Sequence, residues 1–226
     1  AKQHNIPVPV KKEKPYSIDE NLWGRSIECG MLEDPSAEPH EDVYSWSSSP
    51  ETSPDIPTYM DIYFDNGIPK SLNVSECGPV SLISKLNHIG GSNGVGRIDH
   101  IENRLVGIKS REIYECPAAS ILLKAHGALE DLTLTADLLH YKKGVEQKYS
   151  ELIYYGLWFS PLREALDAFI EKTQEQVAGN VKLKLYKGSA TVVGLESEYS
   201  LYDEALSTYA TGDMFDHSAA KGFIYV

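Results

Sequence analysis

Apolar and polar residues alternate along three stretches of the chain, and this alternation predicts three β-hairpins. Residues 59–73 alternate about a central Asn66-Gly67 pair, which suits the two positive-φ positions of a tight turn. Residues 181–195 alternate in the same way about Lys187-Gly188. Within residues 94–115, apolar side chains alternate with charged ones. One face of that hairpin can therefore be buried while the other presents hydrogen-bonding groups.

Apolar residues recur at helical spacing in four other segments, which predicts four amphipathic helices. They cover residues 79–91, 118–129, 136–155 and 161–177. Proline suits the first turn of the first helix, and Gly90-Gly91 is expected to stop it. The side chains expected to be buried are Val80, Ile83 and Leu86 in the first helix, Ala118, Ile121, Leu122, Ala125 and Leu129 in the second, Leu138, Val145, Tyr149 and Leu152 in the third, and Leu162, Leu166, Phe169, Ile170 and Val177 in the fourth.

The order of these segments predicts an α+β fold, with a mixed or antiparallel sheet, hairpins and several amphipathic helices, because regular βαβ alternation is lacking. Residues 34–57 are rich in Pro, Ser, Glu and Asp, which predicts a long surface excursion anchored by Tyr44 and Trp46. The opening Ala1-Lys2-Gln3-His4-Asn5 lacks an initiator Met and is typical of the end of a helix. We therefore expect a fragment of a longer protein.

Composition and charge narrow the possible partners. The net charge of −12 argues against a nucleic acid or an anionic membrane as a partner. The nearest approach to a basic run, Lys11-Lys12-Glu13-Lys14, is expected to be a solvated edge. No apolar run approaches the ~18 residues of a membrane span, and no leader opens the chain. Three cysteines without metal-ligand spacing fit reduced thiols, so a cytoplasmic location is expected.

Three familiar kinds of site are not predicted. The seven histidines are scattered, so no metal site is expected. Residues 90–97 are rich in glycine but lack the closing Gly-Lys-Ser/Thr of a phosphate loop and follow a helix, so a loop that ends the helix is favoured and no cofactor is assigned to this chain. No nucleophile elbow occurs, and no residue is predicted to be catalytic.

Two polar pairs remain as candidates for a ligand site. Hydroxyls, a carboxylate and a phenol together offer donors and acceptors, which suits a zwitterionic or amide-like ligand. For Ser17 and Ser26, the alternative is that they cap the turn around residues 19–21. For Glu102, the alternative is an ion pair with Arg104 or Arg111. The candidates are Ser17 with Ser26, and Glu102 with Tyr114.

Several long segments have the order of charged, hydroxyl and glycine residues found in one known family. They include Pro15-Tyr16-Ser17-Ile18-Asp19-Glu20-Asn21-Leu22-Trp23-Gly24, Gly96-Arg97-Ile98-Asp99-His100-Ile101-Glu102-Asn103-Arg104, Gly107-Ile108-Lys109-Ser110-Arg111-Glu112-Ile113-Tyr114-Glu115 and Tyr154-Tyr155-Gly156-Leu157-Trp158-Phe159-Ser160-Pro161-Leu162-Arg163. In these segments the chain resembles the synthetase part of the argininosuccinate synthase family. The resemblance covers essentially the whole chain.

The resemblance implies an activity and a set of ligand contacts. Enzymes of this family join citrulline to aspartate in arginine biosynthesis, with ATP, accompanied by Mg, as co-substrate. The ureido oxygen of citrulline attacks the α-phosphorus of ATP, and the amine of aspartate then displaces AMP. By this resemblance, the citrulline-contacting positions of the chain are Ser17, Ser26, Glu102 and Tyr114.

The chain also departs from the family pattern. The family's N-terminal nucleotide-binding domain, with its Ser-Gly-Gly-x-Asp-Thr-Ser loop, has no counterpart in these residues. We therefore expect residues 1–226 to form one synthetase domain that binds citrulline, reaches ATP and aspartate only through the missing domain, and is inactive alone. The family forms homotetramers, so self-association is expected. The alternative is an oligomerisation or scaffold module that binds no ligand.

Overall fold

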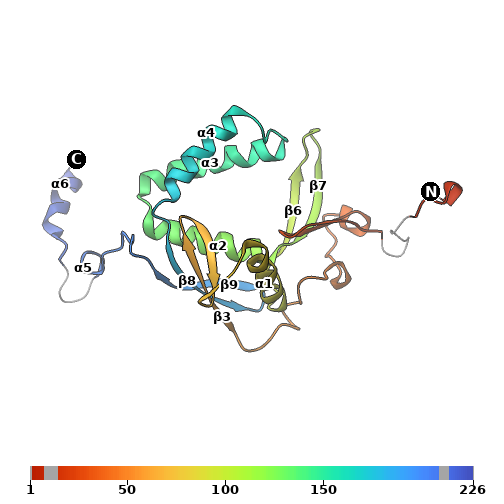
Figure 1. Cartoon of the computed structure of the whole chain (residues 1–226), viewed down its shortest axis with the longest axis horizontal. Helices are drawn as coiled ribbons and strands as arrows, with labels where there is room; N and C mark the ends of the chain where they lie inside the picture. Colours follow the sequence, from red (N-terminus) through yellow and green to blue (C-terminus); the bar gives the residue numbers. More distant parts are fainter. Residues whose placement is uncertain (1, 8–14, 209–213, 226) are drawn as a thin grey trace.

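The computed structural model describes residues 2–7, 15–208 and 214–225 and folds them into helices and two antiparallel sheets (Figure 1). This confirms the α+β class, with two sheets in place of the single sheet expected. A 3₁₀ turn at Lys2–His4 is followed by Asn5 at φ 51°, the left-handed conformation that suits the end of a helix. The basic run at residues 11–14 lies outside the described residues.

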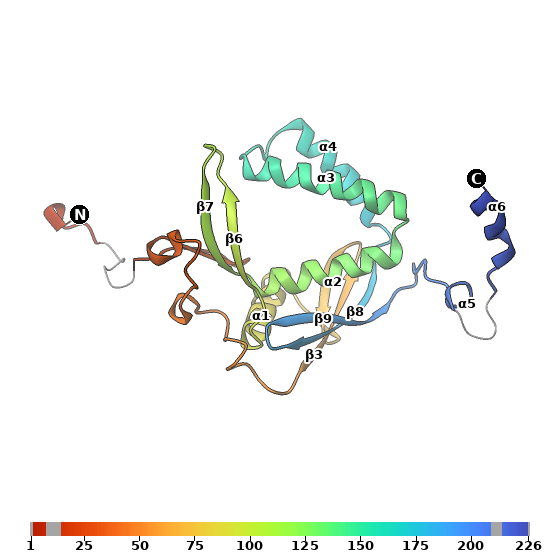
Figure 2. The same ribbon diagram turned by 180° about the vertical axis from the view of Figure 1, so that it is seen from behind.

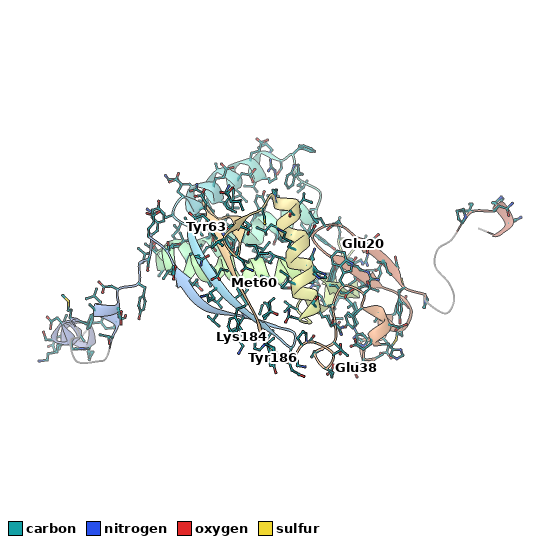
Figure 3. The ribbon with its side chains drawn as sticks, turned by 60° about the horizontal axis from the view of Figure 1, so that its bottom comes forward. Glu20, Glu38, Met60, Tyr63, Lys184 and Tyr186 are labelled. Atoms are coloured by element: carbon teal, nitrogen blue, oxygen red, sulfur yellow. The ribbon has the colours of Figure 1, made fainter. Side chains whose placement is uncertain are left out.

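The larger sheet has five strands in the order β5-β4-β3-β8-β9. Both hairpins predicted for it are confirmed, since Asn66 and Gly67 have φ 50° and 72°, and Lys187 and Gly188 have φ 48° and 83°. Figure 3 brings this sheet forward, with Tyr63, Lys184 and Tyr186 on its strands. The strands are β3 (Thr58–Asp65), β4 (Ile68–Leu72), β5 (Ser75–Glu76), β8 (Gly179–Tyr186) and β9 (Ser189–Glu196).

Helix α2 packs against β8 and β9, and α1 packs against α2 and β4, which places the main core between the helices and the larger sheet. Helices α3 and α4 run as a pair on the other side of α2 (Figures 1 and 2). The helices are α1 (Pro79–Ser92), α2 (Pro117–Thr133), α3 (Ala136–Tyr154) and α4 (Pro161–Gln174), followed by the short α5 (Glu204–Ser207) and α6 (Ala220–Tyr225). None of the helices in the described ranges is long and apolar enough to span a bilayer.

The apolar stripe of α2 is confirmed, but those of α1 and α4 are partly wrong. In α1 Leu86 is buried as predicted and Leu82 is buried as well, whereas Val80 is 63 % exposed, because α1 is covered on one side only, by α2 and β4. In α4, Leu162 is exposed although it continues the helical stripe. Leu166, Phe169 and Ile170 are half-buried against α3, and Val177 is buried but lies after the helix, which ends at Gln174 and not at residue 177.

Gly90 and Gly91 do not stop α1, which continues to Ser92. Their role is close packing. A Cβ at Gly91 would lie 2.0 Å from the carbonyl oxygen of Trp46, and one at Gly90 would lie 2.8 Å from the side chain of Ile121. Both glycines therefore allow neighbouring segments to approach the last turn of the helix.

The smaller sheet has four strands in the order β1-β2-β7-β6, and its β6–β7 hairpin stands beside the α3–α4 pair (Figures 1 and 2). One side of the sheet contacts a small core made of Ile27, Leu32, Val43 and Ile113. The hairpin predicted within residues 94–115 is confirmed, because β6 and β7 pair antiparallel. The strands are β1 (Ser17–Glu20), β2 (Arg25–Glu28), β6 (Arg97–Asn103) and β7 (Lys109–Glu115).

Residues 34–57 form the predicted excursion, but polar contacts anchor it more than aromatic ones. The fully buried carboxylate of Glu115 accepts hydrogen bonds from the backbone N–H groups of Ser45, Trp46 and Ser47, at 2.9–3.1 Å. It also accepts from the Ser47 hydroxyl at 2.7 Å and from Arg25 at 2.7 Å. The excursion is therefore held against the sheet by a carboxylate of β7.

Candidate functional site

The strand register brings all four predicted site residues to one face of the smaller sheet. Residues paired across strands share a face, as do residues two apart along a strand. Ser26 pairs with Tyr114, and Tyr114 pairs with Ile98, which lies four residues before Glu102. Ser17 pairs with Glu28, two residues after Ser26. Two hairpins far apart in sequence therefore present these four side chains together.

This face is rich in hydrogen-bond acceptors. The same register places the carboxylates of Asp19, Glu28, Glu102 and Glu112 on it. The guanidinium of Arg104, just beyond β6, reaches over the face and binds Glu28 and Glu112, each at 2.6 Å. These two carboxylates raise the pKa of Arg104, Glu112 more than Glu28. One guanidinium thus faces four carboxylates, so the face favours ligands that carry N–H groups or a positive charge.

Tyr114 lies at the centre of the face, with its hydroxyl between two carboxylates. The hydroxyl is hydrogen-bonded to Glu102 and lies 3.0 Å from Oε2 of Glu112. Burial raises the pKa of Tyr114 above its usual range, and the hydrogen bonds to Glu102 and Glu112 raise it further. The phenol therefore keeps its proton at physiological pH and acts as a donor.

The structure contradicts the ion-pair alternative for Glu102, and the capping alternative for the serines only in part. Arg104 pairs with Glu28 and Glu112, and Arg111 pairs with Asp99, so neither arginine forms the ion pair with Glu102. The turn after β1 is capped by Asn21, whose side chain accepts hydrogen bonds from the N–H groups of Trp23 and Gly24. Ser17 and Ser26 lie in paired strands, and the hydroxyl of Ser26 donates to the backbone carbonyl of Asp19 at 3.5 Å, so this serine keeps one contact with the turn.

A cleft of about 910 Å³ opens over this face. Ser26, Glu102 and Tyr114 line it, whereas Ser17 shares the face but is not one of its lining residues. The opposite wall comes from α3, where the hydroxyl of Tyr154 donates to the carbonyl of Asn103 at 3.3 Å and ties the helix to the hairpin. The lining residues of that wall are Gln147, Ser150, Glu151, Tyr154 and Tyr155. The volume is in the range of small-molecule sites.

Sequence reasoning missed part of this site. Glu28 and Glu112 lie two residues from Ser26 and Tyr114, so the strand period alone could have placed them on the same face. No sequence pattern links the far wall to the hairpins. The contact between α3 and β6 depends on how the α3–α4 pair packs, which is a tertiary property.

The residues present do not suit a nucleotide or a metal ion. A triphosphate requires several cationic or N–H donors, but the one arginine that reaches over the face is already bound to two carboxylates. Within residues 2–7, 15–208 and 214–225, no group of three or more His, Cys, Asp or Glu side chains is arranged to hold a metal ion. The chemistry of the face therefore favours a ligand that carries N–H groups.

Comparisons with known proteins show similarity over essentially the whole chain. The family model described as "Arginosuccinate synthase C-terminal domain" matches residues 16–226. The chain is 58 % identical over 226 residues to the argininosuccinate synthase of Gloeobacter violaceus, and 58 % identical over 224 residues to that of Symbiobacterium thermophilum. These matches cover 100 % and 99 % of the chain, but 57 % and 56 % of the two relatives. The chain thus spans little more than half the length of the curated relatives that it matches.

Proposed function

The chain belongs to the argininosuccinate synthase family, and we propose that it is the citrulline-binding synthetase domain of an enzyme that joins citrulline to aspartate. The observation that supports this most is the acceptor-rich face of the smaller sheet, where Ser26, Glu102 and Tyr114 line one cleft. The proposal covers residues 1–226 as one domain and places the enzyme in arginine biosynthesis.

Citrulline suits this face because it carries N–H groups at both ends, in the α-ammonium and in the ureido group. The carboxylate of Glu102 accepts from such groups, while the hydroxyls of Ser26 and Tyr114 can either donate or accept. The role of the chain is to bind and orient citrulline so that its ureido oxygen can reach the α-phosphorus of ATP. ATP with Mg, and aspartate, would bind to another part of a full-length synthase, because the guanidinium that reaches over this face, Arg104, is already bound to two carboxylates.

We expect the 226-residue chain on its own to bind citrulline weakly and not to turn it over. Part of the ligand contacts would be missing, so the entropy lost on binding is poorly compensated. Citrulline added to about 10 mM should shift the NMR amide signals of Ser26, Glu102 and Tyr114, with a dissociation constant in the millimolar range. Norvaline, which has the α-amino acid end but no ureido group, is the control ligand and should shift them less.

The same samples are then mixed with ATP, Mg and aspartate, and pyrophosphate is measured. No release above background is expected. Citrulline-dependent pyrophosphate release from the isolated chain would contradict the assignment of ATP to another part of the enzyme. Absence of any citrulline-induced shift would favour the scaffold alternative.

That alternative, an oligomerisation module, is favoured by a specific observation. The end of α3 and the turn that follows expose a run of large apolar side chains, and Phe159 is 89 % exposed. Monomeric proteins seldom leave such a patch uncovered. The exposed residues of this run are Ile153, Tyr154, Tyr155, Leu157, Trp158 and Phe159.

We expect the chain to self-associate, at least to a dimer, through this run. We expect a full-length synthase to form a homotetramer. Light scattering at about 0.1 mM should give at least twice the 25.1 kDa of the chain. The mass should not fall with added salt, because burial of apolar surface is not screened as exposed ion pairs are. A Phe159→Ser variant should shift the equilibrium toward monomer. A strict monomer in the unmodified chain would refute the expectation.

A further inference from the structure

The hydroxyl of Tyr114 has one proton and two carboxylate neighbours. It is hydrogen-bonded to Glu102 and is 3.0 Å from Oε2 of Glu112. Because the phenol stays protonated, it can donate fully to only one of these carboxylates at a time. The structure therefore holds two alternative hydrogen bonds of the same donor.

The two carboxylates differ in how firmly they are held. Glu112 is 8 % exposed, and its other oxygen accepts from Nη2 of Arg104 at 2.6 Å. Arg104 is fixed in turn, because its Nε donates to the hydroxyl of Ser110 at 2.8 Å and its Nη2 also binds Glu28. Glu102 lines the cleft. Glu112 is therefore a fixed acceptor behind the site, and Glu102 is the acceptor that a ligand can reach.

We propose that Glu112 is a positioning residue that takes over the hydrogen bond of Tyr114 when a ligand N–H group binds to Glu102. Without a second acceptor, Tyr114 would go on donating to Glu102 and compete with the ligand for it. With Glu112 in place, the hydroxyl turns its proton away from the cleft, and Glu102 is free to accept. This inference rests on the proposed function, since the ligand is citrulline, and it adds a residue that does not touch the ligand.

The Glu112→Gln substitution tests this with almost no change of shape. Oε1 of Glu112 accepts from Arg104, so in the variant the amide oxygen must stay on that side. The amide NH₂ then faces Tyr114 and donates to its oxygen. The hydroxyl proton is thereby held on Glu102, in the orientation that blocks the ligand.

The experiment is a double-mutant cycle in the full-length synthase that contains this chain, with Glu112→Gln, Tyr114→Phe and the double variant. Glu112→Gln alone is expected to raise the KM for citrulline about tenfold, which corresponds to one hydrogen bond to a charged group, with kcat within about twofold. In the Tyr114→Phe background the same change is expected to have an effect of about twofold or less, because Glu112 acts only through the hydroxyl.

The outcomes separate this inference from the proposed function. If Tyr114→Phe leaves citrulline KM unchanged, the proposed site itself is wrong. If Tyr114→Phe raises KM but Glu112→Gln has no effect, or has the same effect in both backgrounds, then Glu112 is a structural residue and the inference is overturned. Thermal melting of each variant shows whether the protein is folded.

Should the Glu112→Gln variant not fold, a crystal structure of the unmodified synthase with citrulline decides the question. The inference requires an N–H group of citrulline on Glu102 and the Tyr114 hydroxyl about 3 Å from Glu112. A Tyr114 hydroxyl turned away from Glu112 in that complex would overturn it.

Discussion

The Glu115→Gln variant is expected to lose about 3 kcal/mol of unfolding free energy, the largest stability effect of any single isosteric change that we predict. Glu115 has no exposed surface and accepts from four donor groups of residues 45–47, which belong to the excursion. Its second oxygen binds Arg25, which is itself buried. The side-chain amide of glutamine has only one acceptor oxygen. In either orientation its NH₂ group therefore faces either the donors of residues 45–47 or the guanidinium of Arg25.

The physical cause is that a buried guanidinium loses its buried counter-ion. If the amide oxygen stays with the N–H groups of the excursion, the NH₂ faces Arg25, whose guanidinium loses its buried counter-ion and keeps the carbonyl of Val43 at 3.0 Å and an ion pair with the exposed Glu20 at 3.6 Å. Removing one member of a buried ion pair is far more destabilising than removing an exposed one. For a chain of this length, the melting temperature should fall by roughly 6–12 °C.

The matched control is Glu41→Gln. Glu41 also pairs with an arginine of the smaller sheet, Arg97, at 2.7 Å, but its side chain is 64 % exposed. The Glu41→Gln substitution is expected to lower the free energy of unfolding by about 1 kcal/mol or less. Equal shifts in melting temperature for the two variants would show that the Glu115 carboxylate does not anchor the excursion.

The contribution of Glu115 should also depend on pH. Burial alone would raise its pKa, but the hydrogen bonds from Ser45, Ser47 and Arg25 outweigh burial and hold the pKa below its usual range. Because the folded-state pKa is depressed, the stabilisation is present above the ordinary glutamate range and is lost as pH falls through the folded-state value. The difference in stability between the unmodified chain and Glu115→Gln should therefore shrink on acidification below about pH 4. Chemical denaturation at several pH values measures it.

The excursion shows what could and could not be predicted from the sequence. Its position and polarity follow from its Pro- and Ser-rich composition, but Tyr44 and Trp46 are only half-buried, and Val43 and Glu115 hold it in place. A buried glutamate is not visible in a sequence, because its burial depends on donors about 70 residues away. The hairpins and helix α2 could be predicted because turn residues and periodicity are local properties.

In the candidate site, too, the local features could be predicted from the sequence and the long-range contacts could not. Strand period and hairpin pairing place Ser17, Ser26, Glu102 and Tyr114 on one face, and the predicted hairpin at residues 94–115 already implied half of this arrangement. The pairing of β2 with β7 joins the two halves, and it is a long-range contact that no local pattern indicates. The ion pair of Arg104 with Glu28 was unpredictable for the same reason, since the two residues are 76 positions apart.

The second large effect is expected for Glu102→Gln, which should lower kcat/KM for citrulline about 10- to 100-fold in a full-length synthase. The range corresponds to the loss of a hydrogen bond to a charged acceptor. Glu102 lines the cleft and carries no ion-pair partner among the described residues, so its charge is available to a ligand. The amide keeps one acceptor, but it cannot present a charge and presents an NH₂ group to ligand donors.

Glu28→Gln is the matched control for this change. Glu28 belongs to the same acceptor-rich face and is also a glutamate of a strand, but its carboxylate binds Arg104 at 2.6 Å and is not part of the cleft lining. Its amide variant is expected to change kcat/KM about threefold or less, and to do so through Arg104 alone. The comparison keeps the chemistry of the substitution constant and varies only whether the carboxylate reaches the cleft. Steady-state kinetics with citrulline as the varied substrate measures both variants. Equal losses of kcat/KM would mean that Glu102 acts through the charge of the face and not through contact with the ligand.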